Sequence, residues 1–167
     1  MYKKIGLASE TIPKDHLDKL SEWIKTYPRL TQGEKVIEFE AVFAKYIEVD
    51  YATFINSGSS ANLLMATTNL FFKDLQNKKV GIPALSWSTT VSPFIQLGYK
   101  PYLLDADPNN LGVNIDNLYK LIKEEDIATL ILVHVLGHDS SVEKILDICD
   151  EFDIRLLEDN CQSLGST

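Results

Sequence analysis

The chain has 167 residues, of which 45% are hydrophobic and 24% are charged, a composition typical of a soluble globular protein of one domain. Its formal net charge of −8 argues against a nucleic-acid-binding face, which would be basic, and no run of about eighteen apolar residues is present to span a membrane. Cys149 and Cys161 lack the spacing of a metal site or a disulfide framework, so a reducing, cytoplasmic setting is expected.

Two helices are predicted before residue 50. Apolar residues recur at helical spacing over 14–26, just after Pro13, a residue favoured at helix starts. A second amphipathic pattern covers 34–47. We therefore predict an N-terminal helix and loop over residues 1–33 and a larger domain over residues 34–167.

Beyond residue 50, short apolar runs alternate with helical stretches. This alternation predicts βαβ units and a mostly parallel sheet. The apolar runs are nearly continuous, which is expected when helices cover both faces of the sheet, so the predicted fold is a doubly wound, three-layer α/β/α fold. Strands are predicted at 52–56, 79–83, 102–105, 129–134 and 154–158, and helices at about 60–72, 88–97, 114–124 and 140–152.

Small and polar residues follow each predicted strand. In open α/β sheets, ligands bind outside the carboxyl ends of the strands, so a site is expected in these loops. In chain order the loop sequences are SGSS, ALSWS, DADPN, VLGH and DNCQS.

The segment FINSGSSANLL places Gly58, Ser59 and Ser60 at the predicted start of a helix. Backbone N–H groups at a helix start are unpaired and carry partial positive charge, so this turn suits a bound phosphate. Serine is also a preferred N-cap residue, and ordinary capping explains the same pattern. The P-loop pattern GxxxxGK[ST] and the dinucleotide pattern GxGxxG are both absent.

Two other loops carry candidate binding residues. Trp87 follows the second predicted strand, where its indole can offer a flat face to a ligand ring or simply cover the edge of the core. Asp159 ends the fifth predicted strand, where its carboxylate can pair with a ring nitrogen or cap the next turn. Gln162 lies three residues further on and can hydrogen-bond a neighbouring oxygen.

The remaining polar residues near these loops suit structural roles. His134 and His138 are four residues apart, but they follow a strand and flank a glycine, so a hydrogen-bonded or site-lining histidine is expected rather than a metal ligand. Asp105 and Asp107 suit a turn with solvated carboxylates. No metal site is predicted.

The three loops NSGSSA, PALSWSTT and LEDNCQSLGS, in this order and spacing, resemble the DegT family of pyridoxal-phosphate-dependent sugar aminotransferases. The likeness continues through LTQGEKVIEFEAVFAKYIEVDYATF, GYKPYLLDAD, VNIDNL and TLILVHVLG, and it covers roughly residues 30–167. The resemblance implies the partial large domain of a fold type I enzyme, of the aspartate aminotransferase superfamily.

The resemblance also implies a role for each loop. The turn 58–60 matches the segment that holds the phosphate of pyridoxal phosphate or pyridoxamine phosphate. Trp87 matches the aromatic residue stacked on the pyridine ring. Asp159 matches the acid paired with the pyridine nitrogen, and Gln162 matches the residue near the ring hydroxyl.

Within the family, these motifs are most similar to the branch of nucleotide-sugar 3-dehydratases and perosamine-type aminotransferases. Aminotransferases of the family carry a lysine that forms the Schiff base with the cofactor, and the 3-dehydratases carry a histidine there. In the family this position follows LGST, so we expect it beyond Thr167 and expect no catalytic residue within the chain. Lysines on predicted helices or at the opposite sheet edge do not substitute for it.

The function expected from this resemblance is the cofactor-binding part of an aminotransferase acting on nucleotide-linked keto-deoxysugars, in polysaccharide biosynthesis. Glutamate is the expected amino donor, the expected assembly is a homodimer, and no turnover is expected from the isolated chain. The alternatives are a fragment of a nucleotide-sugar 3-dehydratase and a non-catalytic phosphate- or nucleotide-binding α/β module. Neither nucleic acid nor membrane is an expected partner.

Overall fold

The computed structural model describes residues 11–72, 75–138 and 140–165 and divides the chain into two compact units, with the boundary between Phe54 and Ile55. The first unit contains α1 (Lys14–Ile24) and α2 (Glu34–Tyr46), close to the two helices that the sequence predicts. Its last residues belong with α2, because the Phe54 N–H donates to the Glu40 carboxylate at 2.7 Å. The first compact unit therefore ends at Phe54, and the domain boundary predicted after residue 33 stays a prediction.

The segment 52–56, predicted as the first strand, is not a strand, and this prediction is wrong. Its apolar residues suit a strand, but a strand also requires a hydrogen-bonded neighbour. Among the described residues, no strand pairs with this segment. The Phe54 N–H instead donates to the Glu40 carboxylate, and 54% of the Phe54 surface is exposed.

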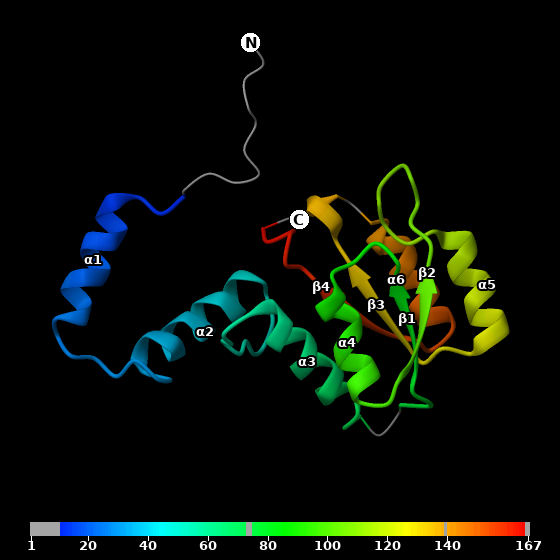
Figure 1. Cartoon of the computed structure of the whole chain (residues 1–167), viewed down its shortest axis with the longest axis horizontal. Coiled ribbons are helices and arrows are strands. Elements are labelled where there is room, and N and C mark those ends of the chain that lie inside the picture. The colour runs from blue at the N-terminus through cyan, green and yellow to red at the C-terminus, as the bar shows by residue number, and fades with distance from the viewer. Residues whose placement is uncertain (1–10, 73–74, 139, 166–167) are drawn as a thin grey trace, which may run out of the picture. The chain divides into compact units, whose positions relative to one another are not determined.

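The second unit contains a four-stranded parallel sheet in the order β2-β1-β3-β4, drawn as arrows in Figure 1. The predicted strands after residue 70 are confirmed to within two residues at each end. Strands β3 and β4 pair residue by residue over their whole length, so that Val133 and Asp159 lie side by side at their carboxyl ends. The strands are β1 (Lys79–Pro83), β2 (Lys100–Leu104), β3 (Thr129–Val133) and β4 (Arg155–Asp159).

Helices cover both faces of this sheet (Figure 1). The 3₁₀ turn η1 (Val135–Gly137) follows β3. Side chains on a strand alternate between faces, and β3 accordingly sends Leu130 and Leu132 into one apolar cluster and Ile131 into another. The helices are α3 (Gly58–Asn69), α4 (Ser88–Gln96), α5 (Ile115–Glu125) and α6 (Val142–Glu151).

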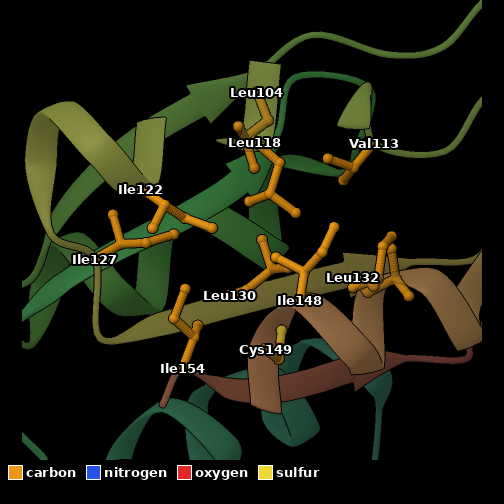
Figure 2. Packing of buried hydrophobic residues seen from close by; sticks show 11 residues of the cluster. Leu104, Val113, Leu118, Ile122, Ile127, Leu130, Leu132, Ile148, Cys149 and Ile154 are labelled. Carbon is orange, nitrogen blue, oxygen red and sulfur yellow. The ribbon is translucent and has the colours of Figure 1, made fainter. Parts of the chain in front are cut away.

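The first cluster joins the sheet to α5 and α6 (Figure 2). Leu118 and Ile122 come from α5, Ile148 comes from α6, and they meet Leu130 of β3. The second cluster joins the sheet to α3 and α4 through residues that include Ala66 and Phe94. Complete burial of a large aliphatic or aromatic side chain stabilises a fold by about 1.5–3 kcal/mol, so these two clusters fix the α/β/α layers.

The layered architecture confirms the predicted fold class, and it places the loops after β1, β3 and β4 at one edge of the sheet. No helix in the described part of the chain is long and apolar enough to cross a membrane.

Candidate functional site

A cavity of about 410 Å³ opens where β1, β3 and β4 end and where α3 and α4 begin. Five of the six residues predicted to bind a cofactor line it; Ser60 does not. The sheet topology brings these residues together, although they are spread over more than a hundred positions of the sequence. The lining residues are Gly58, Ser59, Asn62, Leu85, Ser86, Trp87, Thr89, Thr90, Val133, Val135, Asp159, Cys161 and Gln162.

The start of α3 has the geometry of a capped helix N-terminus. Ser57 is the N-cap residue, and its hydroxyl accepts the Ser60 N–H at 3.2 Å. Gly58 and Ser59, the first two residues of the helix, carry N–H groups that helix geometry leaves without an intrahelical acceptor. The helix dipole adds partial positive charge at this end, which is the kind of environment that favours an anion. The capping role expected for serine therefore falls to Ser57, which caps the Ser60 N–H, and Gly58 and Ser59 line the cavity.

Position 58 requires a glycine because the Cys161 side chain lies close to the backbone there. A Cβ atom at this position would lie 2.7 Å from the Sγ atom of Cys161, which is closer than side-chain carbons and sulfurs approach each other. The loop after β4 therefore packs directly against the backbone of the α3 turn. Any larger residue at position 58 must displace the Cys161 side chain.

Asp159 is the chemical centre of the cavity wall. Its side chain is 7% exposed, and its Oδ2 atom accepts hydrogen bonds from Asn62 Nδ2 at 2.9 Å and from Thr90 Oγ1 at 3.1 Å. Its Oδ1 atom accepts the Cys161 N–H at 3.1 Å. Burial alone raises the pKa of this carboxyl, but the hydrogen bonds from Cys161, Asn62 and Thr90 outweigh burial and hold the pKa below its ordinary value. The site thus presents a buried, ionised carboxylate.

Asn62 and Thr90 were not predicted as site residues from the sequence. Both are polar residues inside predicted helices, and both are buried, Asn62 at 3% exposed and Thr90 at 0%. Asn62 lies one helical turn beyond Gly58, on the side of α3 that faces the sheet. The sequence did hold one signal for them, a polar residue at a position expected to be in the core. Buried polar side chains almost always have a hydrogen-bond partner, so such a residue points to a partner inside the protein.

Cys161 is a further site residue that the sequence did not predict. Its thiol interacts with the Asp159 carboxylate, and this interaction, together with burial, raises the pKa of the thiol to about 11. Cys149 is buried in the first cluster, and burial raises the pKa of its thiol to about 12. Both side chains are therefore thiols rather than thiolates near neutral pH, which is unsuited to nucleophilic catalysis.

Trp87 and Gln162 lie at the rim of the cavity. Trp87 is the N-cap residue of α4 and is 74% exposed, so its indole does not cover the edge of the core. Its stacking on a ligand ring stays a prediction. Gln162 uses its side-chain oxygen to accept the Leu136 N–H at 2.8 Å, which ties the loop after β4 to the loop after β3.

The remaining predicted polar residues take structural roles. His134 is buried, with its Nε2 atom 2.9 Å from Glu158 Oε2, as expected for a hydrogen-bonded histidine. Asp107 accepts the Asn109 N–H at 2.8 Å within a turn. No group of three or more His, Cys, Asp or Glu side chains that could hold a metal ion occurs in the parts of the chain that the structure describes.

The described part of the chain thus combines a parallel α/β/α sheet with a carboxyl edge that carries a helix start, an exposed aromatic residue and a buried carboxylate. Residues 11–167 match the model of the DegT/DnrJ/EryC1/StrS aminotransferase family. The chain belongs to this family, as the sequence resemblance predicted.

Individual relatives agree with the family assignment. The chain is 40% identical over 140 residues to a GDP-4-keto-6-deoxy-D-mannose 3-dehydratase of Escherichia coli O55:H7, covering 82% of this chain and 36% of that protein. It is 24% identical over 147 residues to a GDP-perosamine synthase of Vibrio cholerae, covering 87% of this chain and 37% of that protein. The chain thus spans little more than a third of the length of these relatives.

Solved structures agree as well. A GDP-4-keto-6-deoxymannose 3-dehydratase with a trapped PLP–glutamate geminal diamine matches with a TM-score of 0.89 and 34% identity, over 98% of this chain and 43% of that one. The E. coli GDP-4-keto-6-deoxy-D-mannose 3-dehydratase with bound hydrated PLP matches with a TM-score of 0.87 and 34% identity, over 96% and 42% of the two chains. These neighbours confirm the fold predicted from the sequence.

Proposed function

We propose that this chain is the cofactor-binding part of a pyridoxal-phosphate-dependent aminotransferase that acts on nucleotide-linked keto-deoxysugars. The observation that carries the proposal is the buried, ionised Asp159, in the wall of a cavity that also holds the start of α3 and Trp87. The homologues support the same class of enzyme, since they include a GDP-perosamine synthase and structures that contain PLP.

The residues of the cavity fit the cofactor in size and in chemistry. Its volume of about 410 Å³ lies within the range of about 300–1,000 Å³ found for small-molecule sites. The N–H groups of Gly58 and Ser59 would hold the phosphate, with the Ser59 hydroxyl as a further donor. Asp159 would hold the ring nitrogen, Trp87 would lie against the ring, and Gln162 would lie near the ring hydroxyl.

Bound in this cavity, pyridoxal phosphate would supply a protonated pyridine ring that withdraws electrons from the substrate carbon. Asp159 would keep the proton on the ring nitrogen, because its low pKa prevents the carboxylate from taking that proton itself. The positive end of α3 would balance the phosphate charge. Trp87 would fix the plane of the ring and shield one of its faces from water.

The substrate and setting follow from the relatives. Their names include a GDP-linked 4-keto-6-deoxysugar and a lipopolysaccharide biosynthesis protein, so we propose a nucleotide-linked keto-deoxysugar destined for a surface polysaccharide. Glutamate is the proposed amino donor, in keeping with the PLP–glutamate adduct of one structural neighbour. We propose a homodimer in the cytoplasm.

A second candidate, a nucleotide-sugar 3-dehydratase, is favoured by one observation. Two 3-dehydratases that accept GDP-4-keto-6-deoxy-D-mannose are 40% and 37% identical to the chain, whereas two GDP-perosamine synthases are 24% and 25% identical. In the family, a lysine at the cofactor-tethering position indicates an aminotransferase and a histidine indicates a dehydratase. Reading the coding DNA past Thr167 distinguishes the two candidates.

Binding of pyridoxamine phosphate to the purified chain tests the proposed site. This probe has no aldehyde, so it cannot react with surface lysines. We expect saturable quenching of tryptophan fluorescence and a loss of affinity of about tenfold or more in Asp159→Asn, since a hydrogen bond between charged groups is lost. Asp153→Asn, the same change at an exposed residue that accepts from Gln76 at 2.6 Å, is the matched control and should bind normally.

Two further probes separate the alternatives. Pyridoxamine without the phosphate should bind at least about tenfold more weakly than the phosphorylated form, because the α3 start holds the phosphate. A plain phosphate- or nucleotide-binding module would instead bind inorganic phosphate or GDP, and it would be indifferent to Asp159→Asn. That pattern would overturn the assignment of Asp159 as the partner of a pyridinium ring.

A further inference from the structure

We propose that Asn62 and Thr90 are positioning residues for Asp159, which hold the Oδ2 atom of its carboxylate and thereby fix the direction in which the carboxylate meets a cationic ring. The inference rests on the proposed function. The sequence motifs give neither Asn62 nor Thr90 a role. It concerns residues that act on the cofactor through Asp159.

Three elements converge on this carboxylate. Asn62 comes from α3, Thr90 from the first turn of α4, and Asp159 from the end of β4. The two donors reach the same oxygen, Asn62 Nδ2 at 2.9 Å and Thr90 Oγ1 at 3.1 Å. Asn62 Nδ2 also lies 3.5 Å from Thr90 Oγ1, at the outer limit of a hydrogen bond. Two donors from different helices leave the carboxylate little freedom to rotate.

The two oxygens of the carboxylate are used differently. Oδ2 accepts two donors, which fills the two lone-pair positions of one oxygen. Oδ1 accepts the Cys161 N–H, and the Cys161 thiol also interacts with the carboxylate. A thiol is a weak donor, so it is the group that gives way most easily to an incoming ring N–H.

Packing does not explain these polar residues. The interface between the sheet and helices α3 and α4 is largely apolar, with Ala66, Ile82 and Phe94 fully buried. Its other buried polar side chain on α3, Asn69, has partners of its own in Tyr99 and Thr129. A leucine at position 62 and a valine at position 90 would fill similar volumes without the cost of burying polar groups. The polar pair is therefore explained by its action on Asp159, because a buried carboxylate without donors takes up a proton near neutral pH more readily.

Isosteric variants test the inference. Asn62→Leu and Thr90→Val remove each donor while keeping the side-chain volume, and Thr90→Ser restores the hydroxyl. Asn69→Leu is the matched control, because Asn69 is a buried asparagine on the same helix whose amide donates to Tyr99 and Thr129 and not to Asp159. Circular dichroism establishes which variants are folded, and Thr90→Val is the milder of the two.

Two readouts are needed. The first is the titration of the Asp159 carboxyl by carbon-13 NMR in the chain without ligand, and the second is the affinity for pyridoxamine phosphate. We expect Asn62→Leu and Thr90→Val to raise the pKa of Asp159 and to weaken binding about tenfold, the equivalent of one lost charge-assisted hydrogen bond. Thr90→Ser should restore both readouts, and Asn69→Leu should change neither, even if it lowers the free energy of unfolding.

The inference fails if neither variant moves the Asp159 titration, or if the titration moves while the affinity stays that of the wild type. It also fails if Asn69→Leu weakens binding as much as Asn62→Leu, because the effect would then come from lost stability. If the wild-type chain does not bind pyridoxamine phosphate, the proposed function fails instead, and the carboxyl titration alone decides whether Asn62 and Thr90 control Asp159.

Discussion

Substituting Gly58 with alanine should disturb the site through Cys161. The new methyl group would lie 2.7 Å from Cys161 Sγ, well inside the usual contact distance of about 3.5–4.0 Å. Cys161 is exposed and has one rotatable bond, so we expect its thiol to turn away while α3 stays in place. This rotation gives up the interaction between the thiol and the Asp159 carboxylate.

The expected change in stability is modest. A hydrogen bond to a charged group contributes about 1.5–3 kcal/mol at most, and alanine in place of glycine returns up to about 1 kcal/mol of helix propensity. We therefore expect Gly58→Ala to lower the free energy of unfolding by about 1 kcal/mol. In a Cys161→Ala background the clash is absent, so the same substitution should be neutral or slightly stabilising.

Thiol alkylation by iodoacetamide provides the more direct assay. With a pKa of about 11, Cys161 should react with a rate that still rises steeply between pH 7 and pH 9.5, while Cys149 stays protected by burial. In Gly58→Ala the thiol leaves Asp159, its pKa falls toward the ordinary value of 9.0, and the rate at pH 9 should rise by about tenfold or more.

Two results would refute this reasoning. One is an alkylation profile that is the same in Gly58→Ala and in the wild type, which would mean that Cys161 does not pack between Gly58 and Asp159. The other is an equal cost of Gly58→Ala in urea denaturation with and without Cys161, since a direct contact requires the two substitutions to be non-additive.

Two more predictions concern the same cavity. Trp87→Ala should weaken pyridoxamine phosphate binding about three- to tenfold, as expected for the loss of one ring contact. It should change the free energy of unfolding by less than about 0.5 kcal/mol, because the indole is exposed. An unchanged affinity in a binding titration would exclude stacking. Because the pKa of Asp159 is lowered by folding, its ionised form stabilises the fold above the ordinary carboxyl pKa of 3.8, and this contribution is lost as the pH falls through the lower folded pKa. The urea midpoint should therefore fall less between pH 5 and pH 3 in Asp159→Asn than in the wild type. An equal fall in both proteins would contradict the lowered pKa of Asp159.

Most elements of the second unit could be predicted because their signals are local. The strands from residue 79 onward are apolar runs bounded by loops, and helices α5 and α6 show clear apolar faces. The segment 52–56 has the same composition but fails as a strand, because strand formation depends on a hydrogen-bonded neighbour and composition says nothing about that neighbour.

The site residues divide in a similar way. Trp87, Asp159 and Gln162 could be predicted to line a cavity because they end or follow strands. The rule that ligands bind at the carboxyl ends of strands needs only the order of strands and loops along the chain. Asn62 and Thr90 could not, because they lie within helices and matter only through a carboxylate that is distant in sequence. The close approach of Cys161 to Gly58 depends on side-chain packing, which spacing does not reveal.

The central claim is that the cavity at the carboxyl edge holds the cofactor, with its phosphate at the start of α3 and its ring between Trp87 and Asp159. Titrating the nitrogen-15-labelled chain with pyridoxamine phosphate tests this claim residue by residue. We predict saturable shifts of the Gly58, Ser59 and Cys161 amides and of the Trp87 indole N–H with a single dissociation constant. Shifts confined to the small cavity at the other end of β4, lined by residues that include Asp153 and Arg155, or no shifts at millimolar ligand, would contradict it.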